Sequence, residues 1–171
     1  MAHGILILGG ARSGKSRHAE QLALAHDGPR VYIATATAQD EEMHARIAEH
    51  RRRRKEQGNW RNVEEPLHLT RALRRHAAPE TFIVVDCLTL WITNMMLNRH
   101  DVAAAVTELA EALPALPGAI CLVSNEVGLG IVPDNALARA FRDEAGFAHQ
   151  LLAQVADEVI FMVAGLPMKV K

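Results

Sequence analysis

The stretch GILILGGARSGKS, residues 4–16, decides the fold class of this chain. Its first part is a short apolar run that predicts a buried strand over 4–8, and the residues after it carry apolar side chains at helical spacing. Between the two, Gly9, Gly14, Lys15 and Ser16 fit the pattern G-x-x-x-x-G-K-[ST] of a phosphate-binding loop. The strand before it and the helix after it are the context that this motif requires, so a chance glycine-rich turn is the weaker interpretation.

Each part of this loop has a physical role. Glycines allow backbone angles and close approach that a Cβ would forbid, so that successive N–H groups can point at phosphate oxygens. Lys15 would reach the β and γ phosphates, and the Ser16 hydroxyl would ligate Mg²⁺. A helix that opens at Lys15 adds its positive end to the same place. The predicted nucleotide-binding loop consists of Gly9, Gly10, Ala11, Arg12, Ser13, Gly14, Lys15 and Ser16.

Short apolar runs alternate with helical patterns along the rest of the chain. This alternation is typical of a parallel sheet with crossover helices, and most runs lack the polar alternation of half-exposed strands. The length of 171 residues fits one domain over 1–171. The predicted strands cover 4–8, 30–34, 60–64, 81–86, 119–124 and 158–163. The predicted helices cover 15–26, 40–57, 67–77, 88–113 with a break near 98–101, and 134–156 with an N-cap at Asp134.

Composition limits the class of protein. Lysine and arginine total 19 against 20 aspartates and glutamates, a formal charge of −1, whereas chains that bind nucleic acid by bulk electrostatics are usually basic. Cys87 and Cys121 lie far apart in apolar stretches and predict buried thiols rather than a metal or disulfide site. We find no signal-peptide pattern and no run of about 18 to 20 apolar residues, so we expect a cytoplasmic protein without a membrane span.

An aspartate ends the strand predicted over 81–86. In proteins with this kind of loop, an acidic residue at the end of a neighbouring strand holds Mg²⁺ directly or through water. Asp86 is therefore the candidate magnesium ligand beside Ser16. The alternative is an N-cap of the following helix, where aspartate is also favoured.

The stretch 40–57 carries four consecutive arginines, Arg51–Arg54, directly after His50. At about 100° per residue on a helix, His50 shares an inward-facing stripe with Arg54, whereas Arg52 points the opposite way. A satisfied core histidine and a solvated helix face are the plain interpretations. Guanidinium groups hold phosphates well, however, and a neutral imidazole is a competent nucleophile toward phosphorus.

Together these motifs resemble the bifunctional adenosylcobinamide kinase/adenosylcobinamide-phosphate guanylyltransferases of cobalamin biosynthesis. The resemblance covers almost the whole chain, and the order and spacing of its motifs are highly specific. It rests on GGARSGKSRHAE (9–20), YIATA (32–36), DEEMHARIAEHRRRR (40–54), DCLTLWITN (86–94), SNEVGLGIVPDN (124–135), RAFRDEAG (139–146) and the terminal GLPMKVK.

The resemblance implies a two-step enzyme with a P-loop NTPase-type, RecA-like α/β fold: a mostly parallel sheet flanked by helices in three layers. It would phosphorylate adenosylcobinamide with ATP or GTP and then transfer GMP from GTP to that phosphate through a histidine, the role that the match gives to His50. The family's assemblies are trimeric. By the same match, the nucleotide site would also include Ala34, Thr35, Ala36, Arg51, Arg52, Arg53, Arg54, Glu64 and Asp86. Glu65 is the alternative to Glu64, one residue away.

The sequence supports two further expectations, one for the segment 124–135 and one for His149. The stretch 124–135 describes a shaped loop at the carboxyl edge of the sheet, where ligands bind in open α/β folds, and we expect the corrinoid or a subunit contact there. His149 stands where the family pattern has asparagine, and we expect a variable position at a helix surface or subunit interface without a catalytic role. The sequence names no general base for the kinase step.

Two other functions stay open at this stage. A single-activity P-loop kinase for another small alcohol would use the arginines as a lid and would form no covalent GMP adduct. A nucleotide-switched nucleic-acid-binding module would use them as an arm, with steeply salt-dependent binding. Near-neutral charge and the scarcity of aromatic residues for base stacking speak against the second.

Overall fold

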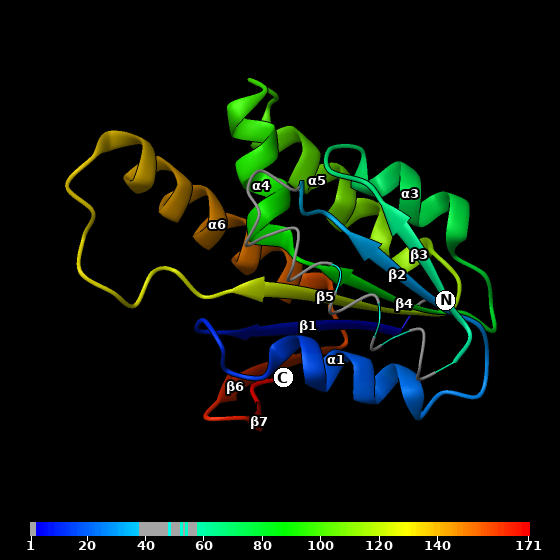
Figure 1. The fold of residues 1–171 in the computed structure, drawn as a ribbon. Coiled ribbons are helices and arrows are strands. Elements are labelled where there is room, and N and C mark those ends of the chain that lie inside the picture. The colour runs from blue at the N-terminus through cyan, green and yellow to red at the C-terminus, as the bar shows by residue number, and fades with distance from the viewer. Residues whose placement is uncertain (1–2, 38–47, 49–51, 53, 55–57) are drawn as a thin grey trace.

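The structure is a computed structural model that describes residues 3–37, 48, 52, 54 and 58–171 (Figure 1). Ala48, Arg52 and Arg54 are helical, while the rest of the helix predicted over 40–57 lies outside the described residues. The elements are β1 (His3–Gly9), α1 (Lys15–Leu24), β2 (Arg30–Ala34), β3 (Trp60–Glu64), α3 (Leu69–His76), β4 (Phe82–Asp86), α4 (Leu88–Leu97), α5 (Val102–Ala112), a short 3₁₀ turn (Leu113–Ala115), β5 (Ala119–Asn125), α6 (Ala136–Val155), β6 (Glu158–Val163) and β7 (Leu166–Lys169).

The strands form one seven-stranded sheet in the order β3-β2-β4-β5-β1-β6-β7. All neighbours pair in parallel except β7, which runs antiparallel to β6. In the register of the central strands, Gly9 at the end of β1 lies opposite Asn125 at the end of β5, and Asp86 at the end of β4 lies opposite Val123. The carboxyl ends of these strands therefore meet at one edge of the sheet.

Helices cover both faces of the sheet, which gives the three layers that we expected. Figure 1 shows α1 on one face and α3, α4, α5 and α6 on the other. The α1 face is packed by Ala19 and Ala23 of the helix against Ile5, Ile7 and other residues of the central strands. The opposite core is larger and is built around the fully buried Trp91 of α4. A strand buried on both faces cannot alternate apolar and polar residues, which is why β1, β4 and β5 read as continuous apolar runs.

The sequence predicted most boundaries within two residues. The break near 98–101 is confirmed, because α4 ends at Leu97 and α5 begins after Asp101, whose side chain accepts a hydrogen bond from the Ala104 N–H. The N-cap predicted at Asp134 is wrong by one residue: Asn135 caps α6, and its Oδ1 accepts from the Ala138 N–H at 2.7 Å.

β7 is the element that the sequence did not predict. Its four residues are all exposed and carry no burial pattern from which a strand could be inferred. Ala164 and Gly165 connect it to β6 with positive φ angles of 51° and 81°, so a tight turn sends the chain back along the sheet edge.

None of the described helices is long and apolar enough to span a lipid bilayer.

Candidate functional site

The phosphate loop leaves the carboxyl end of β1 and leads directly into α1, as predicted. Gly14 has a left-handed φ of 96° and is the N-cap, so α1 begins at Lys15. A Cβ on Gly14 would lie 3.2 Å from the Cα of Gly165, and one on Gly9, where φ is 155°, would lie 2.7 Å from the Ser13 Oγ. Both glycines are therefore required by backbone angle and by space.

Lys15 folds back over this loop. Its side chain is almost fully buried, and Nζ donates to the Gly10 carbonyl at 2.5 Å and lies 3.5 Å from the Ser13 Oγ. The ammonium group thus lies against Gly10 and Ser13 of the loop, and α1 begins at Lys15 itself. A phosphate chain in the loop would meet both positive charges.

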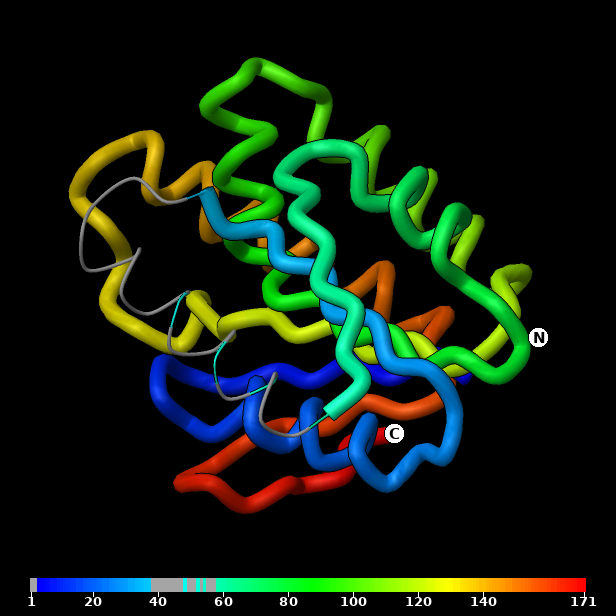
Figure 2. The backbone as a smooth tube through the Cα atoms, turned by 45° about the vertical axis from the view of Figure 1, so that its right-hand side comes forward, coloured from blue at the N-terminus to red at the C-terminus, as the bar shows by residue number. Residues whose placement is uncertain are grey.

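The C-terminal hairpin supports the loop from outside. The Gly165 N–H, in the turn between β6 and β7, donates to the Ser13 carbonyl at 3.0 Å. Figure 2 shows the tip of this hairpin, drawn in red, at the same end of the sheet as the dark-blue loop after β1. The sequence motif GLPMKVK marked this segment only by resemblance, whereas the structure shows its contact with the loop.

Asp86 ends β4, and its carboxylate is held by a buried tyrosine. The Tyr32 hydroxyl donates to Asp86 Oδ2 at 2.6 Å. Burial, and after it the neighbouring carboxylate of Asp86, raise the pKa of Tyr32 well above its ordinary value of 10, so the hydroxyl remains a donor at neutral pH. The alternative that Asp86 caps the next helix is wrong, because Cys87 is the N-cap of α4 and no side chain caps it.

Ser16 and Asp86 fit a magnesium site. Mg²⁺ is usually bound by one or two carboxylates together with substrate phosphates and waters, so a hydroxyl and a single carboxylate beside a phosphate loop are a sufficient donor set from the protein. Tyr32 occupies Oδ2 of Asp86 and turns the carboxylate group, which leaves Oδ1 as the candidate ligand atom. Within the described residues there is no cluster of three or more His, Cys, Asp or Glu that could hold a metal by itself.

Arg54 lies directly behind Tyr32. Its guanidinium stands 3.5 Å from the centre of the Tyr32 ring, its Nε donates to Asn62 Oδ1 at 3.0 Å, and an Nη lies 3.5 Å from Glu20 Oε1. Arg54 is 2% exposed, whereas Arg52 is exposed, which agrees with the predicted helical stripe. The described contacts of Arg54 are with protein groups, and its predicted nucleotide contact stays a prediction.

His50, Arg51 and Arg53 lie outside the described residues, so their predicted roles stay predictions. The segment Ala34–Ala36 begins at the last residue of β2, at the carboxyl edge. Its central residue, Thr35, is fully buried: Oγ1 donates to the Cys87 carbonyl at 2.7 Å and accepts from the Cys87 N–H at 2.9 Å. Thr35 therefore ties the end of β2 to the start of α4.

The structure separates Glu64 from its neighbour Glu65. Glu64 ends β3 and is exposed, whereas Glu65 Oε1 accepts from the backbone N–H groups of Leu67 and His68 at 3.1 and 2.8 Å. Glu65 thus caps the start of α3, and the predicted nucleotide contact of Glu64 stays a prediction. The buried thiols are confirmed, and burial is the main cause that raises the pKa of Cys87 to about 11.

The prediction for His149 is wrong. We expected a helix surface or subunit interface, but His149 is 6% exposed and its Nε2 lies 2.7 Å from the buried Ser124 Oγ on β5. Its Nδ1 lies 3.8 Å from Glu126 Oε2, at the start of the loop over 126–135. A histidine facing a sheet end from α6 was invisible to sequence reasoning, because no local pattern shows which residue of a long helix meets which strand.

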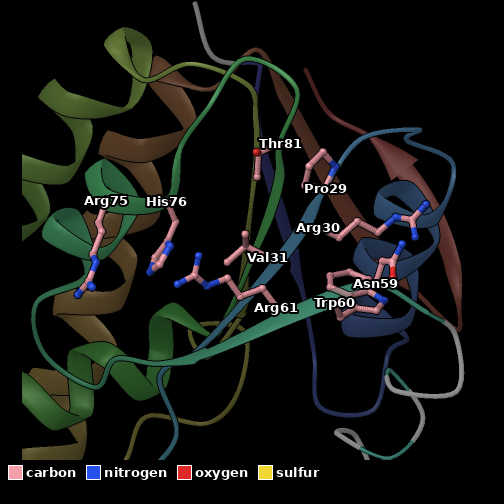
Figure 3. Close-up of a pocket in the computed structure, with 9 residues that line it drawn as sticks. All are labelled: Pro29, Arg30, Val31, Asn59, Trp60, Arg61, Arg75, His76 and Thr81. Atoms are coloured by element: carbon pink, nitrogen blue, oxygen red, sulfur yellow. The ribbon is translucent and has the colours of Figure 1, made fainter.

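A cleft of about 440 Å³ lies at the other edge of the sheet, beside the first residues of β2 and β3 (Figure 3). Arg61, Arg75 and His76 come together on one side of it, and burial followed by the two guanidinium charges lowers the pKa of His76. Arg30 is turned toward α1, where its Nε donates to the Ala23 carbonyl at 2.7 Å. Because the phosphate loop follows the carboxyl ends of the strands, this cleft is not part of the nucleotide site.

Comparison with known proteins decides the family. The model of the family described as cobinamide kinase / cobinamide phosphate guanyltransferase matches residues 5–170. The chain belongs to this family. The bifunctional assignment is thereby confirmed, and the alternative of a single-activity kinase is not supported.

Curated relatives of this cobinamide kinase/guanylyltransferase agree over the full length. A bifunctional adenosylcobalamin biosynthesis protein of Pseudomonas aeruginosa is 54% identical over 169 residues, covering 97% of this chain and 96% of that protein. A protein of the same description from Salmonella typhimurium is 43% identical over 183 residues, covering 98% of this chain and 99% of that protein. Among solved structures, an ATP synthase subunit, NeqB from Nanoarcheaum equitans, has a TM-score of 0.52 at 10% identity and covers 93% of this chain and 45% of that chain, which supports the α/β fold alone.

The burial of His149 predicts a pH effect on stability. Burial lowers its pKa below 6.5 and outweighs the opposing effect of Glu126, so the unfolded chain takes up this proton first as the pH falls. Stability is therefore lost as the pH drops through 6.5 toward the folded-state pKa. We expect His149→Asn to show a smaller fall of Tm from neutral to mildly acidic pH than the wild type, measured by calorimetry. His100→Asn, at an exposed side chain, is the matched control; equal slopes for the wild type and His149→Asn would contradict the prediction.

The burial of Arg54 predicts a large loss of stability on truncation. Arg54→Ala removes the positive charge that pairs with Glu20 and leaves the Glu20 carboxylate, 3% exposed, buried without that arginine. This should lower the free energy of unfolding by about 3 kcal/mol. The double variant Arg54→Met/Glu20→Gln should recover part of this loss in urea denaturation. Arg74→Ala, which breaks the exposed pair with Glu108, should cost under about 1 kcal/mol. Equal losses for Arg54→Ala and Arg74→Ala would refute a buried anchor.

Proposed function

We propose that this chain phosphorylates the aminopropanol hydroxyl of adenosylcobinamide with ATP or GTP and then transfers GMP from GTP to the new phosphate. The products would be adenosylcobinamide-GDP and pyrophosphate. The observation that carries the proposal is the phosphate loop with Lys15 folded over it, near the Asp86 carboxylate held by Tyr32, in a chain of the cobinamide kinase/guanylyltransferase family.

In the kinase step the substrate hydroxyl attacks the γ phosphate. Lys15 and the N–H groups of Gly9–Ser16 stabilise the negative charge that develops on the phosphate oxygens, and the positive end of α1 adds to their effect. Ser16 and Asp86 would hold Mg²⁺, which when bound neutralises charge on the β and γ phosphates. Tyr32 restrains the orientation of the Asp86 carboxylate through its hydrogen bond to Oδ2.

In the second step His50 attacks the α phosphate of GTP, and pyrophosphate leaves toward the cationic loop. The substrate phosphate then displaces the histidine and takes the GMP. Support comes from Arg54, because the sequence places His50 one helical turn before it on the same stripe, and Arg54 is buried behind Tyr32. Arg51, Arg52, Arg53 and Glu64 would complete the nucleotide site, with Ala34–Ala36 beside them.

The loop over 126–135 would contact the corrinoid or a neighbouring subunit of a homotrimer. Leu129, Ile131 and Val132 are 81%, 97% and 61% exposed. Three exposed large apolar side chains close together on one loop favour a surface that contacts a partner. Figures 1 and 2 both show this segment, in yellow, at the same end of the sheet as the phosphate loop. We place the reaction in the cytoplasm, where nucleoside triphosphates are available and the free Cys87 and Cys121 stay reduced.

The nucleophile is tested by labelling. Wild type incubated with GTP labelled at the α phosphate should retain label on the protein, because the GMP is bonded to an imidazole nitrogen, and His50→Ala should retain none. His44→Ala, six positions earlier in the same stretch, is the matched control and should label like the wild type. Labelling of His50→Ala would remove the nucleophile from this position, and absence of label on an active wild-type kinase would favour the single-activity alternative.

Replacing Lys15 tests whether one phosphate loop serves both steps. Lys15→Ala should lower phosphorylation and guanylylation together, by about 100-fold or more in kcat/KM, because both steps lose a charge stabiliser in the same loop. His50→Ala should reduce guanylylation far more than phosphorylation. Both rates are measured separately, the second with adenosylcobinamide phosphate supplied. Lys169→Ala, on exposed β7, is the control; loss of only one activity in Lys15→Ala would indicate two separate nucleotide sites.

A further inference from the structure

Glu126 stands between the two phosphate-handling elements of the sheet edge. It is the first residue after β5, and β5 lies between β1, which carries the phosphate loop, and β4, which ends at Asp86. The Glu126 N–H donates to the carbonyl of Gly9, the first glycine of the loop, at 2.9 Å. Its backbone position is therefore fixed to Gly9, where β1 ends and the loop begins.

The carboxylate of Glu126 is oriented from two sides. Oε1 accepts from the Gly128 N–H at 2.6 Å, and Oε2 lies 3.8 Å from His149 Nδ1. His149 is in turn fixed through Nε2, 2.7 Å from the Ser124 Oγ. Ser124 is fully buried and His149 nearly so, whereas the Glu126 side chain is 22% exposed. Buried supports thus present a carboxylate that solvent, and hence a substrate, can reach.

The kinase step needs a proton acceptor, because the attacking group is an alcohol. Kinases commonly place a carboxylate beside the hydroxyl for this purpose. Among the described acidic residues at this edge, Asp86 is bonded to Tyr32, Glu65 to the start of α3, and Glu64 lies on the edge strand β3. Of these four, Glu126 is the one whose backbone is bonded to Gly9, where the phosphate loop begins.

We propose that Glu126 is the catalytic base of the phosphorylation step, and that Ser124 and His149 are positioning residues for its carboxylate. This rests on the proposed function. The substrate hydroxyl gives its proton to the Glu126 carboxylate while its oxygen forms a bond to the γ phosphorus. The bond from that phosphorus to the β–γ bridging oxygen breaks, and the nucleoside diphosphate leaves with that oxygen. Protonated Glu126 then returns the proton to solvent through its exposed side.

The second step provides an internal control. There the attacking group is the phosphate made in the first step, whose oxygens already carry negative charge, so no proton has to be removed. The formation of the histidine adduct from GTP likewise needs no proton transfer to Glu126. A catalytic base for the alcohol should therefore matter for one activity and not for the other two, whereas a purely structural carboxylate should affect all three alike.

The test uses Glu126→Gln, whose side-chain oxygen can still accept from the Gly128 N–H but cannot take a proton at neutral pH. We expect kcat for transfer of γ-labelled phosphate to adenosylcobinamide to fall by about 10²- to 10⁴-fold with unchanged KM for the nucleotide. Labelling by α-labelled GTP and transfer of GMP to supplied adenosylcobinamide phosphate should stay at wild-type rates. Asp143→Asn, on the exposed face of α6, is the control.

The positioning residues have their own readout. His149→Leu should lower kcat of phosphorylation alone, and His149→Asn, which keeps a polar side chain between Ser124 and Glu126, should restore most of it. Equal losses of all three activities in Glu126→Gln or His149→Leu, or full phosphorylation by Glu126→Gln, would overturn the proposal. A wild-type protein that lacks phosphorylation or GMP transfer would instead overturn the proposed function, so the two failures are distinct.

Discussion

The positions of the phosphate loop, Asp86 and Glu126 at the carboxyl edge of the sheet depend on the parallel register of the central strands. Because β4, β5 and β1 are neighbours that run in one direction, the residues that end them are brought to one line although they are far apart in the chain. The loop that begins at the end of β1, Asp86 at the end of β4 and Glu126 directly after β5 therefore lie at the same edge of the sheet. An antiparallel β5 would send Glu126 to the opposite edge, beside the basic cleft, and would leave the loop without it.

A second constraint fixes the orientation of Asp86, the candidate magnesium ligand. Tyr32 links Asp86 to Arg54, and Arg54 is fixed by Glu20 of α1 and Asn62 of β3. These contacts join Arg54 to α1 and to the middle of β2 and β3. The run Arg51–Arg54 is the most conspicuous charge cluster of the sequence. Arg54, which is described and buried, nevertheless makes its described contacts with protein groups. A charge run can thus serve as an anchor as well as a phosphate contact.

The sequence predicted the sheet well because its strands are buried on both faces and so read as uninterrupted apolar runs. It failed at β7, where four exposed residues carry no such pattern. It also misjudged His149, since helical periodicity shows that a residue faces inward but not which partner it meets there. The position of the phosphate loop between β1 and α1 was predicted, because its pattern lies in consecutive residues. The contacts of Tyr32, Glu126 and Ser124 were not predicted, because each depends on a residue distant in the chain.

The sequence by itself determined the loop, the order of the described strands and helices from β1 to β6, and, through the combination and spacing of its motifs, the family. These are local properties: backbone angles, side-chain size and periodicity are encoded within a few neighbouring residues. Only the tertiary structure decided that Asp86 is held by a tyrosine rather than capping a helix, that Glu65 caps the start of α3, and that His149 faces Glu126. Those outcomes depend on contacts across strands and layers, whose energies are set by burial and geometry that no single segment contains.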